Sequence, residues 1–111
     1  MEILFKSTKL RKIMSSEALL VREFGKENAR VIMRRMIVLQ AAECLADVPS
    51  RRPERCHALF GKRQGEYAVD VKHPYRIILQ PAHEPLPVLE DSSIDLERVT
   101  SIRILGVEDY H

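Results

Sequence analysis

Four histidines are the side chains best suited to acid–base chemistry, because the unperturbed pKa of imidazole is about 6.5. They are His57, His73, His83 and His111. Cleavage of RNA without a metal needs a base for the 2′-hydroxyl, an acid for the leaving 5′-oxygen and cations around the phosphate. Taken singly, each histidine is more often structural than catalytic. Placement favours two of them: His57 lies in a predicted strand, and His111 follows the last one.

Arg76 is the cation most suited to a phosphate, because it lies inside an otherwise apolar strand. It alternates with Tyr75 and Ile77 and should project from the opposite face of that strand. Burial of an unpartnered charge is costly, so we expect the guanidinium to reach solvent or an anion. The alternative is an ion pair with Asp70 or Glu66 on the adjacent strand.

Other common catalytic motifs are absent from the sequence. It contains no H-E-x-x-H, C-x-x-C or D-x-D run, no Walker loop and no G-x-G-x-x-G. The four glycines provide no nucleophile elbow for a Ser/His/Asp hydrolase. We therefore expect no cofactor and no metal. Acid–base chemistry on RNA, or binding alone, remains.

Composition indicates one globular domain that covers residues 1–111, with 45% hydrophobic and 31% charged residues. Residues 1–83 contain 16 Lys and Arg against 9 Asp and Glu, whereas residues 84–111 contain 2 against 7. A basic body favours a phosphate backbone or an acidic protein partner, although a solvated surface gives the same statistics.

No apolar run is long enough to cross a bilayer and no signal peptide is evident, so we expect a cytoplasmic protein. Cys44 and Cys56 are expected to be buried free thiols.

The first half of the chain predicts one strand and two helices. Residues 3–5 form a short apolar strand before a Ser/Thr pair that can cap a helix. Apolar residues at helical spacing then extend over 10–24, where Ser15 or Ser16 could divide the segment into two helices. A longer amphipathic helix is expected over 27–45 and is closed by Pro49.

The second half changes to a strand pattern. Strands are expected over 56–60, 67–71, 75–80 and 101–107, and the first three form an antiparallel meander. Residues 81–98 are rich in proline and acidic side chains and should form a loop or lid, with a helical turn at 95–98. The fold class is therefore α+β. Two helices can cover only one face of such a sheet, which leaves the other face open to a ligand.

The second half also resembles a known family. The segments are R-C-H-A-L-F-G-K-R-Q-G-E-Y-A-V-D over 55–70, H-P-Y-R-I-I over 73–78 and V-T-S-I-R-I-L-G-V-E-D-Y-H over 99–111. Together they resemble HigB-type toxins of the RelE/ParE superfamily, the plasmid maintenance killer proteins. More weakly, K-S at 6–7, F-G at 24–25 and L-Q-A-A-E-C-L-A-D-V-P at 39–49 are similar to the helical hairpin of that family. The resemblance implies an N-terminal strand and a two-helix hairpin on one face of a mainly antiparallel sheet.

That resemblance also implies a function and partners. It implies the toxin of a type II toxin–antitoxin system, which enters the A site of the 30S ribosomal subunit and cuts mRNA. The implied antitoxin is a helix-turn-helix protein. Two alternatives stay open: a ParE-like toxin that inhibits gyrase without cutting nucleic acid, and an inactive domain that only binds an antitoxin.

The resemblance assigns roles to individual residues. The implied catalytic set is Asp109, Tyr110 and His111 in the C-terminal tail, with Arg76 and His57 on the sheet. The implied RNA-binding cations are Lys62, Arg63, Arg55 and Lys72. We expect the fold to gather His111, Arg76 and His57 around one phosphate-sized hollow.

Overall fold

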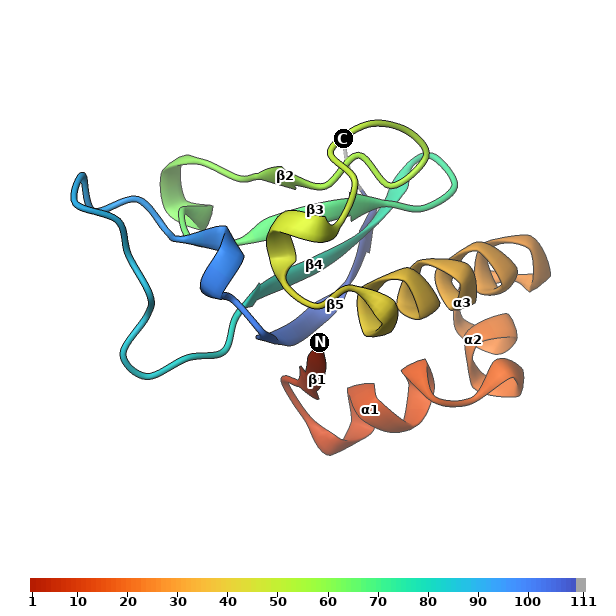
Figure 1. Cartoon of the computed structure of the whole chain (residues 1–111). Coiled ribbons are helices and arrows are strands. Elements are labelled where there is room, and N and C mark those ends of the chain that lie inside the picture. The colour runs from red at the N-terminus through yellow and green to blue at the C-terminus, as the bar shows by residue number, and fades with distance from the viewer. Residues whose placement is uncertain (110–111) are drawn as a thin grey trace.

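The computed structural model describes residues 1–109, which form a five-stranded sheet with three helices on one side (Figure 1). The α+β prediction is confirmed. The strands lie in the order β1-β5-β4-β3-β2. The strands are β1 (Glu2–Phe5), β2 (His57–Ala58), β3 (Tyr67–Asp70), β4 (Tyr75–Pro81) and β5 (Ser101–Asp109), and the helices are α1 (Thr8–Met14), α2 (Glu17–Phe24) and α3 (Lys26–Ala41). Three short 3-10 turns, η1 (Leu45–Asp47), η2 (Gly61–Arg63) and η3 (Leu96–Arg98), join them.

Serine caps explain where the first two helices begin, and Gly25 separates the second helix from the third. The Ser7 hydroxyl accepts a hydrogen bond from the Leu10 amide at 3.1 Å, and the Ser16 hydroxyl accepts one from the Leu19 amide at 3.2 Å. The second cap divides the segment expected over 10–24, as its paired serines suggested. The expected end of α3 at residue 45 is wrong, because the backbone is already extended at Ala42.

The sheet is antiparallel except at β1, which pairs with β5 in parallel. The meander of β2, β3 and β4 is confirmed, although β2 keeps only two of the five residues expected. The last strand lies between β1 and β4 and extends to Asp109, two residues beyond its expected end. At its end, Asp109 therefore lies opposite Tyr75 of β4.

The main core lies between the helices and one face of the sheet. Helix side chains such as Ile32 and Leu39 pack there against Ile77, Leu79 and Ile104 of the sheet, and all five have 0% exposure. On the opposite sheet face, called the open face here, none of the helices formed by residues 1–109 packs (Figure 1). It holds a smaller apolar cluster of Leu59, Ala68, Ile78 and Leu105.

A bulge in β5 decides which side chains reach the open face. Leu79 pairs with Ile104, but the next residue of β4, Ile78, pairs with Gly106, so Leu105 is an extra residue. An extra residue inverts the alternation of side chains beyond it. Glu108 therefore projects from the open face, whereas regular alternation from Ile104 would have directed it into the core.

The acidic loop between β4 and β5 is anchored to the sheet, and its helical turn is confirmed as η3. Nε2 of His83 accepts hydrogen bonds from the amides of Thr100 at 3.0 Å and Ser101 at 3.1 Å. This contact gives His83 a structural role. Among residues 1–109, no helix is long and apolar enough to cross a membrane.

Candidate active site

Three charged side chains form a row across the open face, called the charged row here. Asp70 of β3 is opposite Arg76 of β4, and Arg76 is opposite Glu108 of β5. Directly opposed residues of antiparallel strands project from the same face, so the three lie side by side. Of the two surroundings expected for its guanidinium, solvent or an anion, solvent is excluded, because Arg76 is only 7% exposed. Its anionic neighbours are carboxylates of the protein itself.

Arg63, in the hairpin between β2 and β3, binds Glu108 at one end of this row. Its guanidinium donates to both carboxylate oxygens of Glu108, at 2.6 and 2.7 Å, and its Nε donates to Glu66 at 2.9 Å. Glu66 lies at the hairpin end of the sheet, so the Arg63 side chain extends over the open face to reach Glu108. The Arg63 guanidinium lowers the pKa of Glu108 against the opposing effect of burial, and the charges of Arg76 and Lys6 lower it further.

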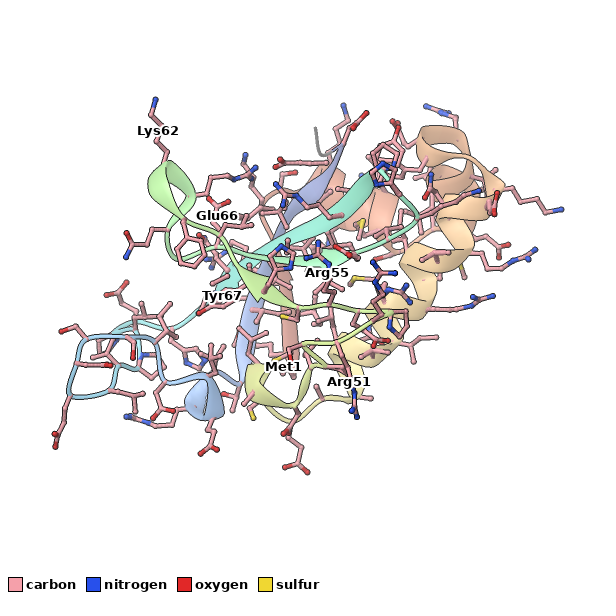
Figure 2. The ribbon with its side chains drawn as sticks, turned by 90° about the horizontal axis from the view of Figure 1, so that it is seen from above. Met1, Arg51, Arg55, Lys62, Glu66 and Tyr67 are labelled. Atoms are coloured by element: carbon pink, nitrogen blue, oxygen red, sulfur yellow. The ribbon has the colours of Figure 1, made fainter. Side chains whose placement is uncertain are left out.

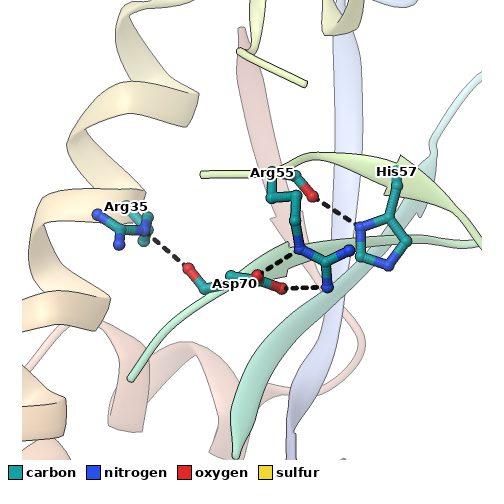
Figure 3. A network of polar contacts seen from close by, with 4 residues as sticks. All are labelled: Arg35, Arg55, His57 and Asp70. Carbon is teal, nitrogen blue, oxygen red and sulfur yellow. Dashed lines mark hydrogen bonds and ion pairs between the residues drawn. The ribbon is translucent and has the colours of Figure 1, made fainter. Parts of the chain in front are cut away.

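Arg55 holds the other end of the row. Its guanidinium binds both carboxylate oxygens of Asp70, at 2.6 and 3.1 Å, and Nε of Arg35 on α3 donates to the Asp70 carbonyl at 2.7 Å (Figure 3). Asp70 and Glu66, the two residues considered as ion-pair partners for Arg76, thus bind Arg55 and Arg63. Bidentate pairs of this kind fix orientation as well as charge.

His57 lies beside Arg55 at the edge of the sheet (Figure 3). Its Nδ1 is 2.6 Å from the carbonyl oxygen of Arg55. A carbonyl can only accept, so we assign the ring proton to Nδ1, which leaves Nε2 of the neutral ring as an acceptor. This tautomer is the one that a general base requires.

The structure divides the expected hollow into two. Arg76 lines a small one of about 80 Å³, which has room for a few water molecules. His57 lines a different hollow of about 840 Å³, between β2 and the segment 45–51.

The predicted catalytic residues Tyr110 and His111 lie outside the described part of the chain. Asp109, the last described residue, is opposite Tyr75, which adjoins Arg76. The residues around the small hollow are Arg55, Asp70, Val71, His73, Tyr75 and Arg76.

Three of the four predicted RNA-binding cations already bind carboxylates. Arg55 and Arg63 are held in the pairs above, and Lys72 pairs with Glu27 of α3, whose pKa this contact lowers. Lys62 is exposed at the tip of the hairpin and points away from the body (Figure 2). Of the four, Lys62 has the geometry expected of a phosphate contact.

Sequence reasoning missed Glu108 as a member of the site. The available signal was its place beside Asp109, directly after the last predicted strand. Regular alternation from Ile104 would direct Glu108 into the core, so the sequence pattern places it on the open face only if the bulge is known.

Neither cysteine takes part in the charged row. Cys44 and Cys56 are both half-buried free thiols, and burial raises the pKa of Cys56 to about 11. Within residues 1–109, no three His, Cys, Asp or Glu side chains gather in a way that could hold a metal ion.

Comparison with known proteins gives one informative result. No protein-family model and no curated protein matches the chain. Among solved structures, the chain is similar to one chain of the YoeB-YefM complex from Staphylococcus aureus, with a TM-score of 0.54. The two share a fold. The alignment covers 100% of this chain and 97% of the other at 14% sequence identity, so the likeness establishes the fold alone.

Proposed function

We propose that the chain is the toxin of a toxin–antitoxin system and that it cuts mRNA on the ribosome. The fold supports the first part, because a solved structure that shares it, the YoeB-YefM complex, is a toxin–antitoxin complex. The resemblance of the segments at 55–70, 73–78 and 99–111 to HigB-type toxins supports the second. We infer HigB-type rather than YoeB-type specificity from those segments.

The observation that carries the proposal is the burial of Arg76 beside the end of β5. A guanidinium with 7% exposure has little bulk water to screen it, so it can stabilise a phosphate strongly. Asp109 lies opposite Tyr75, so the chain enters the predicted catalytic tail next to this cation.

The proposed reaction is transfer of the phosphate to the neighbouring 2′-oxygen. A base takes the 2′-hydroxyl proton, the 2′-oxygen attacks phosphorus, and the 5′-oxygen leaves with a proton from an acid. We assign the acid to His111 and the charge stabilisation to Arg76. His57 is the candidate base, because its Nε2 is the acceptor nitrogen and its partner in the sheet, Ala68, projects from the open face. His57 lines a different hollow from Arg76, so the proposal requires the RNA to span both. Asp109 and Tyr110 complete the proposed site.

The pairs that Arg55 and Arg63 form give these residues a second role. Each holds a carboxylate of the charged row, so both are positioning residues for Arg76 as well as candidate RNA contacts. Lys62 and Lys72 are proposed to contact the RNA backbone from the rim. The basic body suits an acidic antitoxin, which we propose to be a helix-turn-helix protein that covers the open face.

Cleavage of mRNA on purified ribosomes tests the proposal. Ribosomes programmed with one mRNA are incubated with the wild-type chain or with His111→Ala, and new 5′ ends are mapped. We expect cuts with the wild-type chain and about 10²–10⁴-fold slower cutting with His111→Ala. Co-purification with the antitoxin should be unchanged in the variant, which shows that the variant folds.

Each other outcome counts against the proposal. Full activity in His111→Ala would overturn the assignment of the acid. Intact transcripts with gyrase-dependent DNA breaks would indicate a ParE-like inhibitor. Absence of both effects, with antitoxin binding retained, would indicate a domain that only binds its partner.

A further inference from the structure

A second group of cations lines a groove at the edge of the sheet formed by β1 and β5. The groove has a volume of about 530 Å³ and is bounded by residues 3–8. Lys6, Arg11 and Arg103 contribute the charge, and Ser7 and Thr8 contribute hydroxyl groups. We call it the basic groove.

The charges of the basic groove are not neutralised in the way that those of the charged row are. The pairs in and around the row bring together Arg55, Arg63 and Arg76 with three carboxylates, so their formal charges cancel. In contrast, no ion pair within residues 1–109 involves Lys6, Arg11 or Arg103. Within the open face, the groove therefore attracts a polyanion more strongly than the charged row does.

The basic groove and the charged row lie on one continuous surface. Arg103 is opposite Gln80, and the alternation from Ile78 directs both side chains to the open face. Lys6 follows β1 and donates its amide to the Ile104 carbonyl at 2.9 Å, which puts it between Arg103 and Glu108 along β5. At about 3.3 Å per residue, the path along β5 from Arg103 to Glu108 is at most about 17 Å long.

We propose that Lys6, Arg11 and Arg103 bind the phosphates of single-stranded RNA that flank the nucleotide held at Arg76. The inference rests on the proposed function, because it assumes that RNA is the ligand of the open face. It adds a binding track at the far end of the sheet from the positively charged hairpin. On this view the strand approaches Arg76 along β5.

Binding of an uncleavable RNA tests the track separately from catalysis. The probe is a short fluorescent 2′-O-methyl RNA, which lacks the attacking hydroxyl, and binding is followed by anisotropy at several salt concentrations. A groove variant and a control variant lose the same charge, and circular dichroism checks that both fold. The groove variant carries Lys6→Gln, Arg11→Gln and Arg103→Gln; the control variant carries Lys26→Gln, Arg30→Gln and Arg34→Gln on the exposed side of α3.

We expect the groove variant to bind roughly 10- to 100-fold more weakly at 0.1 M salt. The slope of log K against log salt should decrease by about 2, because each single-strand phosphate contact contributes about 0.7. The control variant should bind like the wild-type chain. Equal weakening in the groove and control variants would mean that only net charge matters, and it would overturn the inference.

The cleavage assay separates failure of the track from failure of the function. Normal cutting of ribosomal mRNA by the groove variant would remove the track and leave the nuclease proposal intact. If the wild-type chain binds the probe through the groove but cuts no mRNA, the track stands and the nuclease proposal fails. If the wild-type chain does not bind the probe at all, the track is refuted whatever the cleavage result.

Discussion

Replacement of Glu108 by glutamine should destabilise the protein through the charged row. The substitution keeps the size of the side chain and removes its charge. Arg63 then loses a bidentate partner at 2.6 and 2.7 Å, and the buried Arg76 loses an adjacent anion. The loss at Arg76 should be the larger effect, because its charge has little access to water.

The expected loss in the free energy of unfolding is about 1–2 kcal/mol. The side chains of Arg63 and Glu108 are 36% and 42% exposed, so screening limits their pair to about 0.5–1 kcal/mol. Removal of one partner of a fully buried pair costs about 3–5 kcal/mol. We expect about 1 kcal/mol at Arg76, because Glu108 is only part of its surroundings. Each kcal/mol corresponds to a decrease of about 4 °C or more in the melting temperature.

Urea unfolding of the wild-type chain and Glu108→Gln, followed by circular dichroism, measures this loss. Glu27→Gln is the matched control, because it removes a carboxylate from an exposed ion pair with Lys72 and should leave stability unchanged. A double-mutant cycle with Arg63→Gln isolates the direct pair. If Glu108→Gln is as stable as the control at pH 7, the charged row does not hold Arg76.

The pH dependence has a definite sign. The pKa of Glu108 is below its ordinary value of 4.5 in the folded protein, so the carboxylate contributes stability above that value. This contribution is lost as the pH falls through the lowered pKa. The stability curves of the wild-type chain and Glu108→Gln should therefore converge in acid. A difference that stays constant down to pH 2 would assign the effect to packing.

Two sets of substitutions and one reactivity measurement provide further tests. Ser16→Ala should cost about 1 kcal/mol in urea unfolding, because it removes the cap that starts α2; an unchanged midpoint would contradict the capping role. Leu39→Ala, at 0% exposure, should cost about 2–5 kcal/mol, whereas Ile37→Ala, at 63%, should cost far less. Cys56 should react with iodoacetamide at pH 8 more slowly than Cys44, because burial raises its pKa to about 11. Equal rates in mass spectrometry would refute that explanation.

Local patterns in the sequence were sufficient for most elements of the fold. Ser16 could be recognised as a possible helix start, and the alternation around Arg76 correctly separated that side chain from the core side of β4. The end of α3 was not predictable, since apolar residues continue at helical spacing past Ala42. There the chain leaves the helix for η1, where Leu45 binds the Val99 carbonyl, a contact that depends on residues 54 positions apart.

The candidate site was harder to predict, because it depends on register. Asp70, Arg76 and Glu108 come from three strands, and nothing local indicates which residues lie opposite one another. The bulge at Leu105 adds to this, because one unpaired residue exchanges the two faces of the rest of β5. Without it, Val107 would face the open side and Glu108 the core.

The fold also changes the interpretation of the excess positive charge in residues 1–83, because several of these cations bind carboxylates of the protein itself. The family resemblance implied RNA contacts by Lys72 and by three cations in or near the hairpin, Arg55, Lys62 and Arg63. In the fold, two of these three bind carboxylates that belong to the site, so their charge is used to hold the row in place. The three cations of the basic groove, which form no such pairs, follow β1 or lie in α1 and β5, and the parallel pairing of β1 with β5 brings Lys6 and Arg103 to the same edge of the sheet. A ligand attracted by charge should therefore approach along the β1 edge. The ion pairs of Arg55 and Arg63 should hold Arg76 in a fixed orientation before the ligand reaches it.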